Sequence, residues 1–548
     1  MLSVTIENKK EVIPDTSTYY DLALEYEKKY NKIPMMVNVN GEIKELRRHA
    51  KESDNITFLF YNDESVADAY ARTAIFILLK SIYEVCGKDV DAAMKFRIHH
   101  AYYFELEGKE VSNEMADKIR ETFDANVNSK IKILKNSYSK KDAYNIFEKE
   151  KMYDTKLLFK YVYRKVINLR SIDGYIRYIN DPLLYDTSYI KYYDIRKYKR
   201  GLLLTLPYSN DIKNISYVKP AEKLFNIHND SVNWAKKLKI NTVGKLNQAI
   251  SDNRFDDLVI MTESLQDKQI GDIADEVIKS KCRLLLIDGP TSSGKTSFAK
   301  RLIYHLRALE YNPFPLSCDD FFKEREKTPK KPDGTYDFES IDAIDIKLFN
   351  KIVDDLLSGK EVVLPKFDFA NGKKLYNDKA VNMKKNDILI MEGINCLNPK
   401  LLTNKEDIKA FKIYVSALTE VSIDGANRIA TSDLRLIRRI IRDARTRGYN
   451  SEDTLRIWKN VRLGEEKNIF PFQEEANIFF NSALIYEFSV IKSKVLPMLY
   501  KINEDSDVYN LAQRIIKTLN FFLDVETDCI PSYSIIREFI GKSSLNVN

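Results

Sequence analysis

Residues 284–309 read LLLIDGPTSSGKTSFAKRLIYHLRAL and decide the fold of the carboxy-terminal half of this 548-residue chain. The stretch opens with an apolar run, Leu284–Ile287, which suits a buried strand of a parallel sheet. A complete G-x-x-x-x-G-K-[ST] pattern follows at Gly289–Thr296, and apolar residues then recur with helical spacing from Phe298 to Leu309. A strand, a glycine-rich turn and an amphipathic helix in this order predict a phosphate-binding loop.

The residue types in this loop suit a nucleoside triphosphate, ATP, and its magnesium ion. Glycines let backbone N–H groups wrap around a phosphate, and the amino end of the following helix adds a favourable dipole. Lys295 would bring positive charge to the β- and γ-phosphates, and the Thr296 hydroxyl would face Mg²⁺. The predicted ATP-binding residues are Gly289, Pro290, Thr291, Ser292, Ser293, Gly294, Lys295, Thr296 and Ser297.

Carboxylates follow two further predicted strands. Phe314–Ser317 leads into Cys318–Phe322 (CDDFF), and Asp387–Met391 ends at Glu392. A carboxylate at the end of a strand beside the phosphate loop can accept a proton from an attacking hydroxyl, the role expected for Asp319, although such an Asp pair also caps helices. Glu392 is expected to hold the water shell of Mg²⁺. The pattern predicts an α/β fold, a P-loop parallel sheet with helices on both faces.

Six arginines lie within thirteen residues of the segment Asp433–Gly448 (DLRLIRRIIRDARTRG). The apolar residues recur with helical spacing, so the arginines crowd the other faces of a helix. A basic face in solvent and an RNA-binding face both remain open. Beside a phosphate loop, a lid is favoured, in which guanidinium groups clamp a triphosphate and stabilise the transferring charge.

These blocks, in this order, resemble the uridine kinase/phosphoribulokinase family over roughly residues 284–500. The segments that carry the resemblance are Cys318–Phe322, Asp337–Asp345, Pro365–Phe369, Ile390–Ile394 and Arg438–Asp443. The resemblance implies an ATP-dependent phosphotransferase with Asp319 as general base and a nucleoside as acceptor. The site residues expected on this basis are Asp319, Lys295, Arg438 and Arg442 for catalysis, Thr296 and Glu392 for the metal, and Phe322, Glu339, Phe367 and Arg447 for the nucleoside.

The expected nucleoside site departs from the family pattern. The carboxylate that holds ribose hydroxyls falls on Glu339, and the base-contacting tyrosine falls on Phe367, which cannot donate a hydrogen bond. Asn371-Gly372 stands where the family has a histidine. An enzyme distinguishes bases by hydrogen-bond partners at fixed positions. The sequence therefore supports the reaction, phosphoryl transfer, more strongly than it supports uridine as the acceptor. Uridine or cytidine is the expected acceptor. Another small hydroxyl acceptor, or an RNA- or tRNA-linked nucleotide-binding regulatory protein, is the alternative.

Two units are expected ahead of the kinase-like one. Residues 1–62 combine short strands, a helix at Tyr19–Tyr30 and an Asn40-Gly41 hairpin signal, and they resemble the β-grasp TGS domain. Residues 63–235 resemble the α+β editing domain of threonyl-tRNA synthetase. The metal- or substrate-binding positions of that domain fall on Phe76, Lys80, Ile179 and Leu183. We therefore expect a retained fold that has lost its metal site.

The remaining boundaries are a helical connector at 236–280, the P-loop domain at 281–505 and a helical tail at 506–548. The segment Ile530–Gly541 resembles the closing tail of bacterial two-part chains of the same family, and no chemistry is assigned to it. The adjacent pair His99-His100 is expected to be structural or at the surface, with a binding site as the alternative.

The composition favours a folded protein of the cytoplasm. The five cysteines are isolated in the sequence, which predicts neither a disulfide framework nor a cysteine-rich zinc site. No apolar run approaches the roughly 20 residues that span a bilayer. The net charge of +7 is modest for 548 residues, so nucleic-acid binding has weak support, and homo-oligomerisation is left open.

Overall fold

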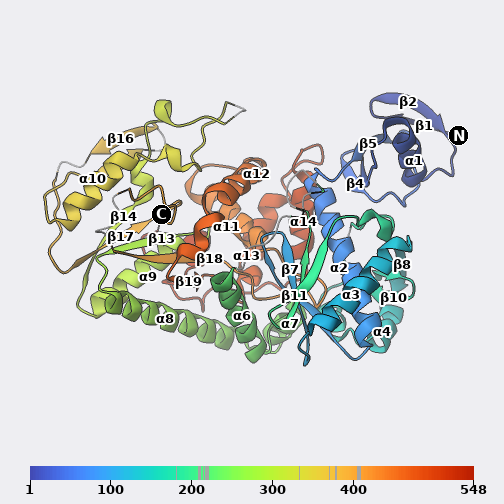
Figure 1. The fold of residues 1–548 in the computed structure, drawn as a ribbon, viewed down its shortest axis with the longest axis horizontal. Coiled ribbons are helices and arrows are strands. Elements are labelled where there is room, and N and C mark those ends of the chain that lie inside the picture. Colours follow the sequence, from blue (N-terminus) through green and yellow to red (C-terminus); the bar gives the residue numbers. More distant parts are fainter. Residues whose placement is uncertain are drawn as a thin grey trace.

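The computed structural model describes residues 1–180, 182–207, 212–213, 215, 221–331, 334–368, 371–376, 379–403 and 409–547. Phe369, at the end of the Pro365–Phe369 block, lies outside the described residues. The amino-terminal units lie at one end of the molecule and the large parallel sheet at the other (Figure 1).

Five strands form the centre of the carboxy-terminal half: β13 (Leu284–Asp288), β14 (Asn312–Ser317), β17 (Asp387–Glu392), β18 (Ala410–Ser416) and β19 (Ile478–Asn481). Their order is β14-β17-β13-β18-β19, and every neighbouring pair is parallel. The predicted parallel α/β architecture is therefore confirmed.

Successive residues of β13 point into two different cores. Leu285 and Ile287 pack beneath α9 (Lys295–Ala308) and α8 (Phe255–Ser280). Leu284 and Leu286 join a core on the opposite face that α10 (Ile346–Leu357) covers. The alternation follows from the pleat of a strand. It places helices on both faces and leaves the carboxyl edge of the sheet for the site.

Helix α8 belongs to this packing rather than to a free linker. The connector predicted at 236–280 is helical, as α7 (Val243–Ser251) and α8. Ile270, Ile273 and Val277 of α8 are buried against α9. The core of the carboxy-terminal half therefore extends ahead of the predicted boundary at residue 281.

The first unit is a mixed sheet crossed by one helix. Its strands are β1 (Leu2–Ile6), β2 (Lys9–Ile13), β3 (Met36–Val39), β4 (Glu42–Lys44) and β5 (Asn55–Leu59), in the order β2-β1-β5-β3-β4. Helix α1 (Tyr19–Tyr30) packs on the sheet through Tyr19 and Leu22. The predicted hairpin forms at Asn40-Gly41, where φ is 54° and 86°. The resemblance of this unit to TGS domains stays a prediction.

The second unit surrounds the long helix α2 (Glu64–Cys86). One of its sheets holds β6 (Ala92–Ile98), β7 (Ala101–Leu106), β11 (Asp194–Tyr198) and β12 (Gly201–Thr205), and the other holds β8 (Leu134–Ser139), β9 (Val166–Ile172) and β10 (Tyr175–Arg177). Its remaining α-helices are α3 (Asn113–Asn128), α4 (Lys140–Lys149) and α5 (Tyr153–Tyr161).

The positions that correspond to the editing-domain ligands lie in the interior of this second unit. Phe76, Ile179 and Leu183 share one apolar core, and Lys80 pairs with Glu84 at 2.5 Å. Among the described residues there is no cluster of three or more His, Cys, Asp or Glu side chains that could hold a metal ion. Hydrocarbon side chains at three of the four positions cannot act as ligands.

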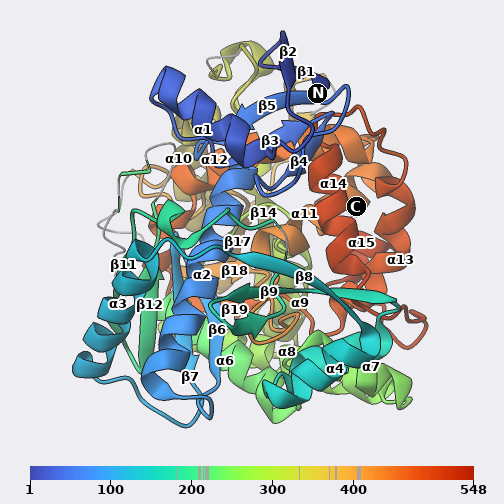
Figure 2. The same ribbon diagram turned by 90° about the vertical axis from the view of Figure 1, so that its right-hand side faces the viewer.

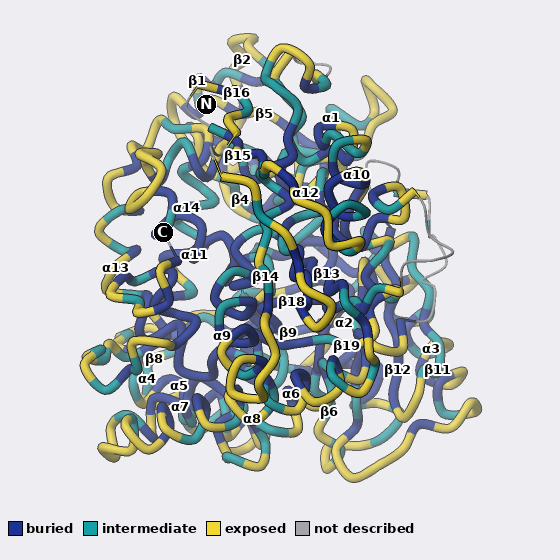
Figure 3. The backbone as a smooth tube through the Cα atoms, turned by 90° about the vertical axis from the view of Figure 1, so that its left-hand side faces the viewer, coloured by how far each residue is buried: buried dark blue, intermediate teal, exposed yellow. Residues whose placement is uncertain are grey.

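The two halves share a core. One apolar cluster joins Phe159 and Leu169 of the second unit to Ile437, Leu484 and other residues of the carboxy-terminal half. Helices α11 (Thr431–Thr446), α13 (Glu487–Leu499) and α14 (Tyr509–Leu519) lie between the parallel sheet and α2 in Figure 1, and α6 (Glu222–Lys237) packs on β19. In Figure 2, α13 and α14 lie on the right-hand side of the view. Figure 3 shows buried backbone in the interior and exposed backbone mostly around the rim.

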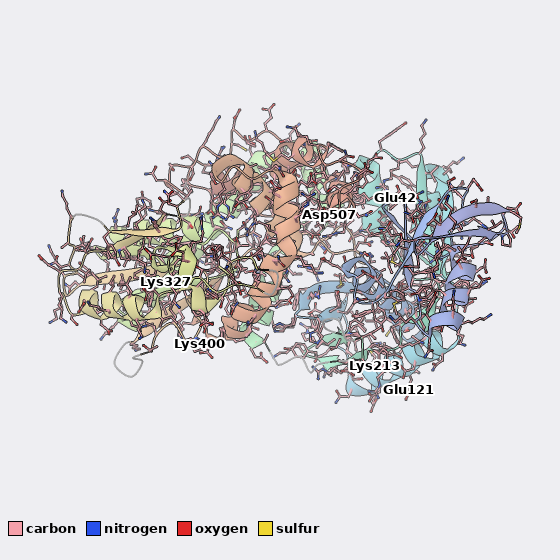
Figure 4. All side chains as sticks on the ribbon, turned by 90° about the horizontal axis from the view of Figure 1, so that it is seen from above. Glu42, Glu121, Lys213, Lys327, Lys400 and Asp507 are labelled. Carbon is pink, nitrogen blue, oxygen red and sulfur yellow. The ribbon has the colours of Figure 1, made fainter. Side chains whose placement is uncertain are left out.

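The predicted helical tail is helical only in part. Beyond α14, the described residues up to 547 contain one short α-helix, α15 (Arg537–Ile540), yet Ile535, Ile536 and Phe539 are fully buried. The amino-terminal sheet meets the same region, because Asn510 donates to the Gly41 carbonyl at 2.7 Å. Glu42 and Asp507 flank this contact in Figure 4, while Lys327 and Glu121 mark the two opposite halves.

In the described part of the chain, the helices lack the combined length and apolar character that crossing a membrane requires.

Asn427 ties the halves together, which gives a first testable prediction. Its Nδ2 donates to the Tyr178 carbonyl at 2.9 Å, and its Oδ1 accepts from the Asn180 N–H at 3.0 Å. Asn427→Ala removes both hydrogen bonds between the halves, so we expect the free energy of unfolding to fall by about 2–3 kcal/mol. Urea titration measures this change. The exposed side chain of Asn520 provides the control, Asn520→Ala, and equal losses in both variants would contradict the assignment.

Candidate active site

The phosphate-binding loop connects β13 to α9 in a conformation that its glycines permit. Gly289 has φ +156°, and a Cβ there would lie 2.0 Å from the Val415 carbonyl oxygen. Gly294 has φ +81° and immediately precedes α9. A side chain at Gly289 is therefore excluded by the backbone of the next strand, and the predicted loop has the close approach that its glycines imply.

Lys295 is buried at the centre of the loop. Its Nζ donates to the carbonyls of Gly289 at 2.7 Å and Pro290 at 3.1 Å. The ammonium thus lies inside the curve of the loop, where the phosphates of a nucleotide would also lie. Ser292 and Ser293 add two buried hydroxyls that have no hydrogen-bond partner among the described residues.

Two carboxylates converge on the loop from neighbouring strands. Asp319 follows the end of β14, and Glu392 ends β17, whose register pairs Ser317 with Glu392. The Thr296 hydroxyl donates to Glu392 at 3.4 Å. Burial raises the pKa of Glu392 to about 7, opposed by the Lys295 ammonium. Burial also raises the pKa of Asp319, again opposed by Lys295.

Thr296 and Glu392 are suitable residues for a magnesium ion. Mg²⁺ in nucleotide sites is held by one or two protein oxygens together with waters and phosphates, rather than by a complete protein cage. The Thr296–Glu392 contact provides this oxygen pair beside the loop. The pair fits the ion that the loop implies, and Mg²⁺ there would neutralise phosphate charge.

The arginine-rich segment is the helix α11, and three of its arginines are buried in ion pairs. Arg435 pairs with Glu465 at 2.5 and 2.8 Å, and Arg438 pairs with Glu487 at 2.5 and 2.7 Å. Arg439 donates to Asp443 at 3.1 Å. A solvated basic face, one of the alternatives at the sequence level, does not describe these three side chains.

These arginines also hold the phosphate-binding loop. Arg435 donates to the Thr291 carbonyl at 3.2 Å, and Arg438 approaches the Ser292 carbonyl at 3.4 Å. Arg439 donates to the Thr291 hydroxyl at 3.2 Å. Arg438, expected to be catalytic, is placed in the structure as a brace of the loop, with its charge already paired.

The more exposed end of α11 faces Asp319. Arg442 and Arg447 both approach Asp443, at 2.8 and 3.7 Å. Both guanidinium groups counteract the burial that raises the pKa of Asp319. The structure therefore brings Asp319 and Lys295 near Arg442, expected to be catalytic, and Arg447, expected to bind the nucleoside.

Three of the residues expected to bind the nucleoside, Phe322, Glu339 and Phe367, come from segments near Asp319. Phe322 and Phe367 lie with ring centroids 5.7 Å apart, and Asp320 accepts from the Phe367 N–H at 3.3 Å. Burial raises the pKa of Glu339 to about 7, increased by Glu465 and opposed by Arg439. Among the described residues, Glu339 Oε2 and the neighbouring Asn395 Oδ1 are buried without a hydrogen-bond partner. Two unpaired acceptors suit a ligand that carries hydroxyl donors.

Comparisons with known proteins find a family match in the carboxy-terminal half. Residues 284–485 match the Phosphoribulokinase / Uridine kinase family. The chain is 28% identical over 194 residues to Uridine-cytidine kinase B of Dictyostelium discoideum, covering 35% of this chain and 71% of that protein. It is 27% identical over 200 residues to Uridine kinase of Macrococcus caseolyticus, covering 36% and 87%. A solved structure titled as a possible uridine kinase from Bacillus stearothermophilus covers 39% of this chain and 98% of its own, with 16% identity and a TM-score of 0.27.

Residues 284–485 form a phosphoribulokinase / uridine kinase family domain. The domain is a phosphotransferase that acts on a hydroxyl acceptor. The two relatives cover 35% and 36% of this chain, and the resemblances proposed for the amino-terminal units stay predictions.

Sequence reasoning missed several residues of the kinase domain. Asp288 is fully buried and accepts from the N–H groups of Gly289 at 2.6 Å and Leu397 at 2.8 Å. The position of Asp288, directly after the apolar run of β13, could have indicated this role from the sequence. Cys318 and Cys396, isolated in the sequence, meet with sulfur atoms 2.9 Å apart. No local pattern indicates that contact.

Glu487 gives a prediction for the kinase domain. Glu487→Ala would leave the Arg438 guanidinium buried without its counter-charge, and breaking a buried pair in this way costs about 3–5 kcal/mol. We expect a loss of this size in the free energy of unfolding, measured by urea titration. Glu361→Ala is the control, because the Glu361 side chain is exposed. A loss no larger than in the control would show that the pair does not stabilise the domain.

Proposed function

We propose that this protein is an ATP-dependent kinase that transfers the γ-phosphate to the 5′-hydroxyl of a nucleoside, with uridine or cytidine as the favoured acceptor. The match of residues 284–485 to the kinase family carries the proposal. The convergence of Asp319, Lys295 and Glu392 on one loop supports it, since these are the residue types that phosphoryl transfer needs.

Each side chain has a defined role in the proposed reaction. Asp319 accepts the proton of the attacking hydroxyl as the new oxygen–phosphorus bond forms and the bond to the leaving ADP oxygen breaks. Lys295, with Arg442 and Arg447, neutralises the charge that develops on the transferring group. Thr296 and Glu392 hold the magnesium ion. Arg438 contributes through the loop that it braces.

The proposed acceptor follows from the unpaired groups of the site. Glu339 Oε2 and Asn395 Oδ1 can each accept a hydrogen bond, and a ribose offers hydroxyl donors. Phe322 and Phe367 provide apolar surface for a flat base. Phe367 lacks a hydroxyl, so discrimination between uracil and cytosine must use backbone groups or other side chains. The relatives, a uridine-cytidine kinase and a uridine kinase, support a pyrimidine nucleoside.

A panel of nucleosides tests the proposal. We expect ADP release from Mg²⁺-ATP to depend on uridine or cytidine. We further expect Asp319→Ala to lower the rate by about 10²–10⁴-fold, the usual contribution of a positioned general base. Lys295→Ala should remove activity through the loss of phosphate binding. Intact ATP binding with no stimulation by any nucleoside would exclude a nucleoside acceptor.

The pKa of Glu392, near 7, predicts a pH dependence of metal-dependent binding. Glu392 must lose its proton to hold the water shell of Mg²⁺. Between pH 8 and pH 6 the ionised fraction of a group with pKa 7 falls from about nine-tenths to about one-tenth. Mg²⁺-ATP should therefore bind up to about tenfold more weakly at pH 6 by calorimetry.

Glu392→Gln is the matched control for this pH dependence. ATP gains and loses protons in the same way with either protein, but the side chain at position 392 of the variant does not titrate. We expect its binding to be weaker at pH 8 and to change less with pH than that of the unaltered protein. The same pH profile in both proteins would assign the dependence to the nucleotide rather than to Glu392.

A further inference from the structure

The carboxylate of Glu538, in α15, contacts the phosphate-binding loop. Its Oε2 accepts from the Ser297 hydroxyl at 2.7 Å and from the Ser297 backbone N–H at 3.3 Å. Glu538 is only 8% exposed. A residue 241 positions further along the chain thus places a buried anion at the start of α9.

The two donors on Ser297 are ones that a nucleotide would use. Ser297 is the third residue of α9, and its N–H is among the first groups of the helix, which have no acceptor within the helix. In a phosphate-binding loop such N–H groups, with the helix dipole behind them, cradle the α- and β-phosphates. The carboxylate of Glu538 therefore occupies a position that suits a phosphate oxygen.

The Glu538 carboxylate and a nucleotide phosphate cannot both bind Ser297, because both are negatively charged. The Glu538 carboxylate already accepts from both the hydroxyl and the backbone N–H of Ser297. A phosphate on Ser297 would face the Glu538 carboxylate at contact distance in a buried setting, where like charges repel strongly. The side chain must leave before the phosphate binds.

The tail backbone is held by other contacts. The Ile535 side chain lies 2.7 Å from the position of a Cβ on Gly294, and Ser534 donates to Glu263 at 2.5 Å. Arg445 donates to the Glu538 carbonyl at 2.5 Å, and the Arg438 guanidinium lies 4.9 Å from the centre of the Phe539 ring. Because these contacts involve main-chain and neighbouring groups, the Glu538 side chain can leave while the tail stays docked.

We propose that Glu538 is a built-in competitor of ATP, whose carboxylate occupies the phosphate-binding end of α9 and lowers the affinity of the loop for nucleotide. The inference rests on the proposed function, because it takes Gly289–Ser297 as the ATP site. It gives the carboxy-terminal tail a regulatory role: any ligand or partner that withdraws α15 would increase ATP binding.

Calorimetric binding of Mg²⁺-ATP to the full chain tests the inference. Glu538→Gln removes the charge and keeps the shape of the side chain, so we expect ATP to bind about tenfold more tightly, the factor that corresponds to one charge-assisted hydrogen bond. Glu526→Gln is the matched control, because Glu526 lies exposed in the same carboxy-terminal segment, and it should leave the affinity unchanged. Glu538→Ala provides a second variant, and thermal melting confirms that each variant is folded.

Unchanged or weaker ATP binding in both folded Glu538 variants would overturn the inference, because Glu538 would then be neutral to the nucleotide or support it. Nucleoside-dependent ADP release, measured on the same proteins, separates this result from the proposed function. If Glu538→Gln binds ATP more tightly but no nucleoside stimulates ADP release, Glu538 is a competitor of ATP and the acceptor is not a nucleoside. If ATP binding is unchanged but a nucleoside stimulates ADP release, the nucleoside acceptor holds and Glu538 is not a competitor.

Discussion

Two buried ion pairs hold α11 against the phosphate-binding loop, and the rest of the site depends on them. In Arg435–Glu465 and Arg438–Glu487 every side chain is at most 2% exposed. Charges buried so completely are tolerated only when their pairing is complete. The same guanidinium groups reach the carbonyls of Thr291 and Ser292, so the conformation of the loop is fixed from outside. The buried part of the arginine run is thus a scaffold, and among the described arginines of the run only the carboxy-terminal ones, Arg445 and Arg447, are exposed.

The same helix explains why the amino-terminal half packs as part of one body with the kinase domain. Asp433, near the start of α11, accepts two hydrogen bonds from Arg514 of α14, at 2.7 and 2.9 Å. The apolar side of α11 joins the cluster that reaches Phe159 and Leu169 of the second unit. The apolar side of α11 therefore belongs to the core that both halves share, while its buried arginines hold the loop.

The sequence predicted the features that depend on contiguous residues. The loop lies in a single stretch, and Asp319 and Glu392 could be placed together because parallel strands end at one edge of a sheet. Partners that are distant in sequence could not be predicted: Glu487 is 49 residues from Arg438, and Glu538 is 241 from Ser297. The packing of α8 was a different case. Apolar residues at Ile270, Ile273 and Val277 carried the signal, but the many charges between them made the segment look like a polar connector.

The balance of charge at the loop connects these observations. Burial raises the pKa of Glu392 to about 7, and the carboxylates of Asp319 and Glu538 add to this shift while the Lys295 ammonium opposes it. Glu538 occupies the donors of Ser297, which would otherwise be buried without an acceptor. A triphosphate would add negative charge to this surplus, and only an accompanying cation or the departure of a carboxylate can compensate. The proposed magnesium ion at Thr296 and Glu392 and the proposed departure of Glu538 would therefore both answer a single electrostatic constraint.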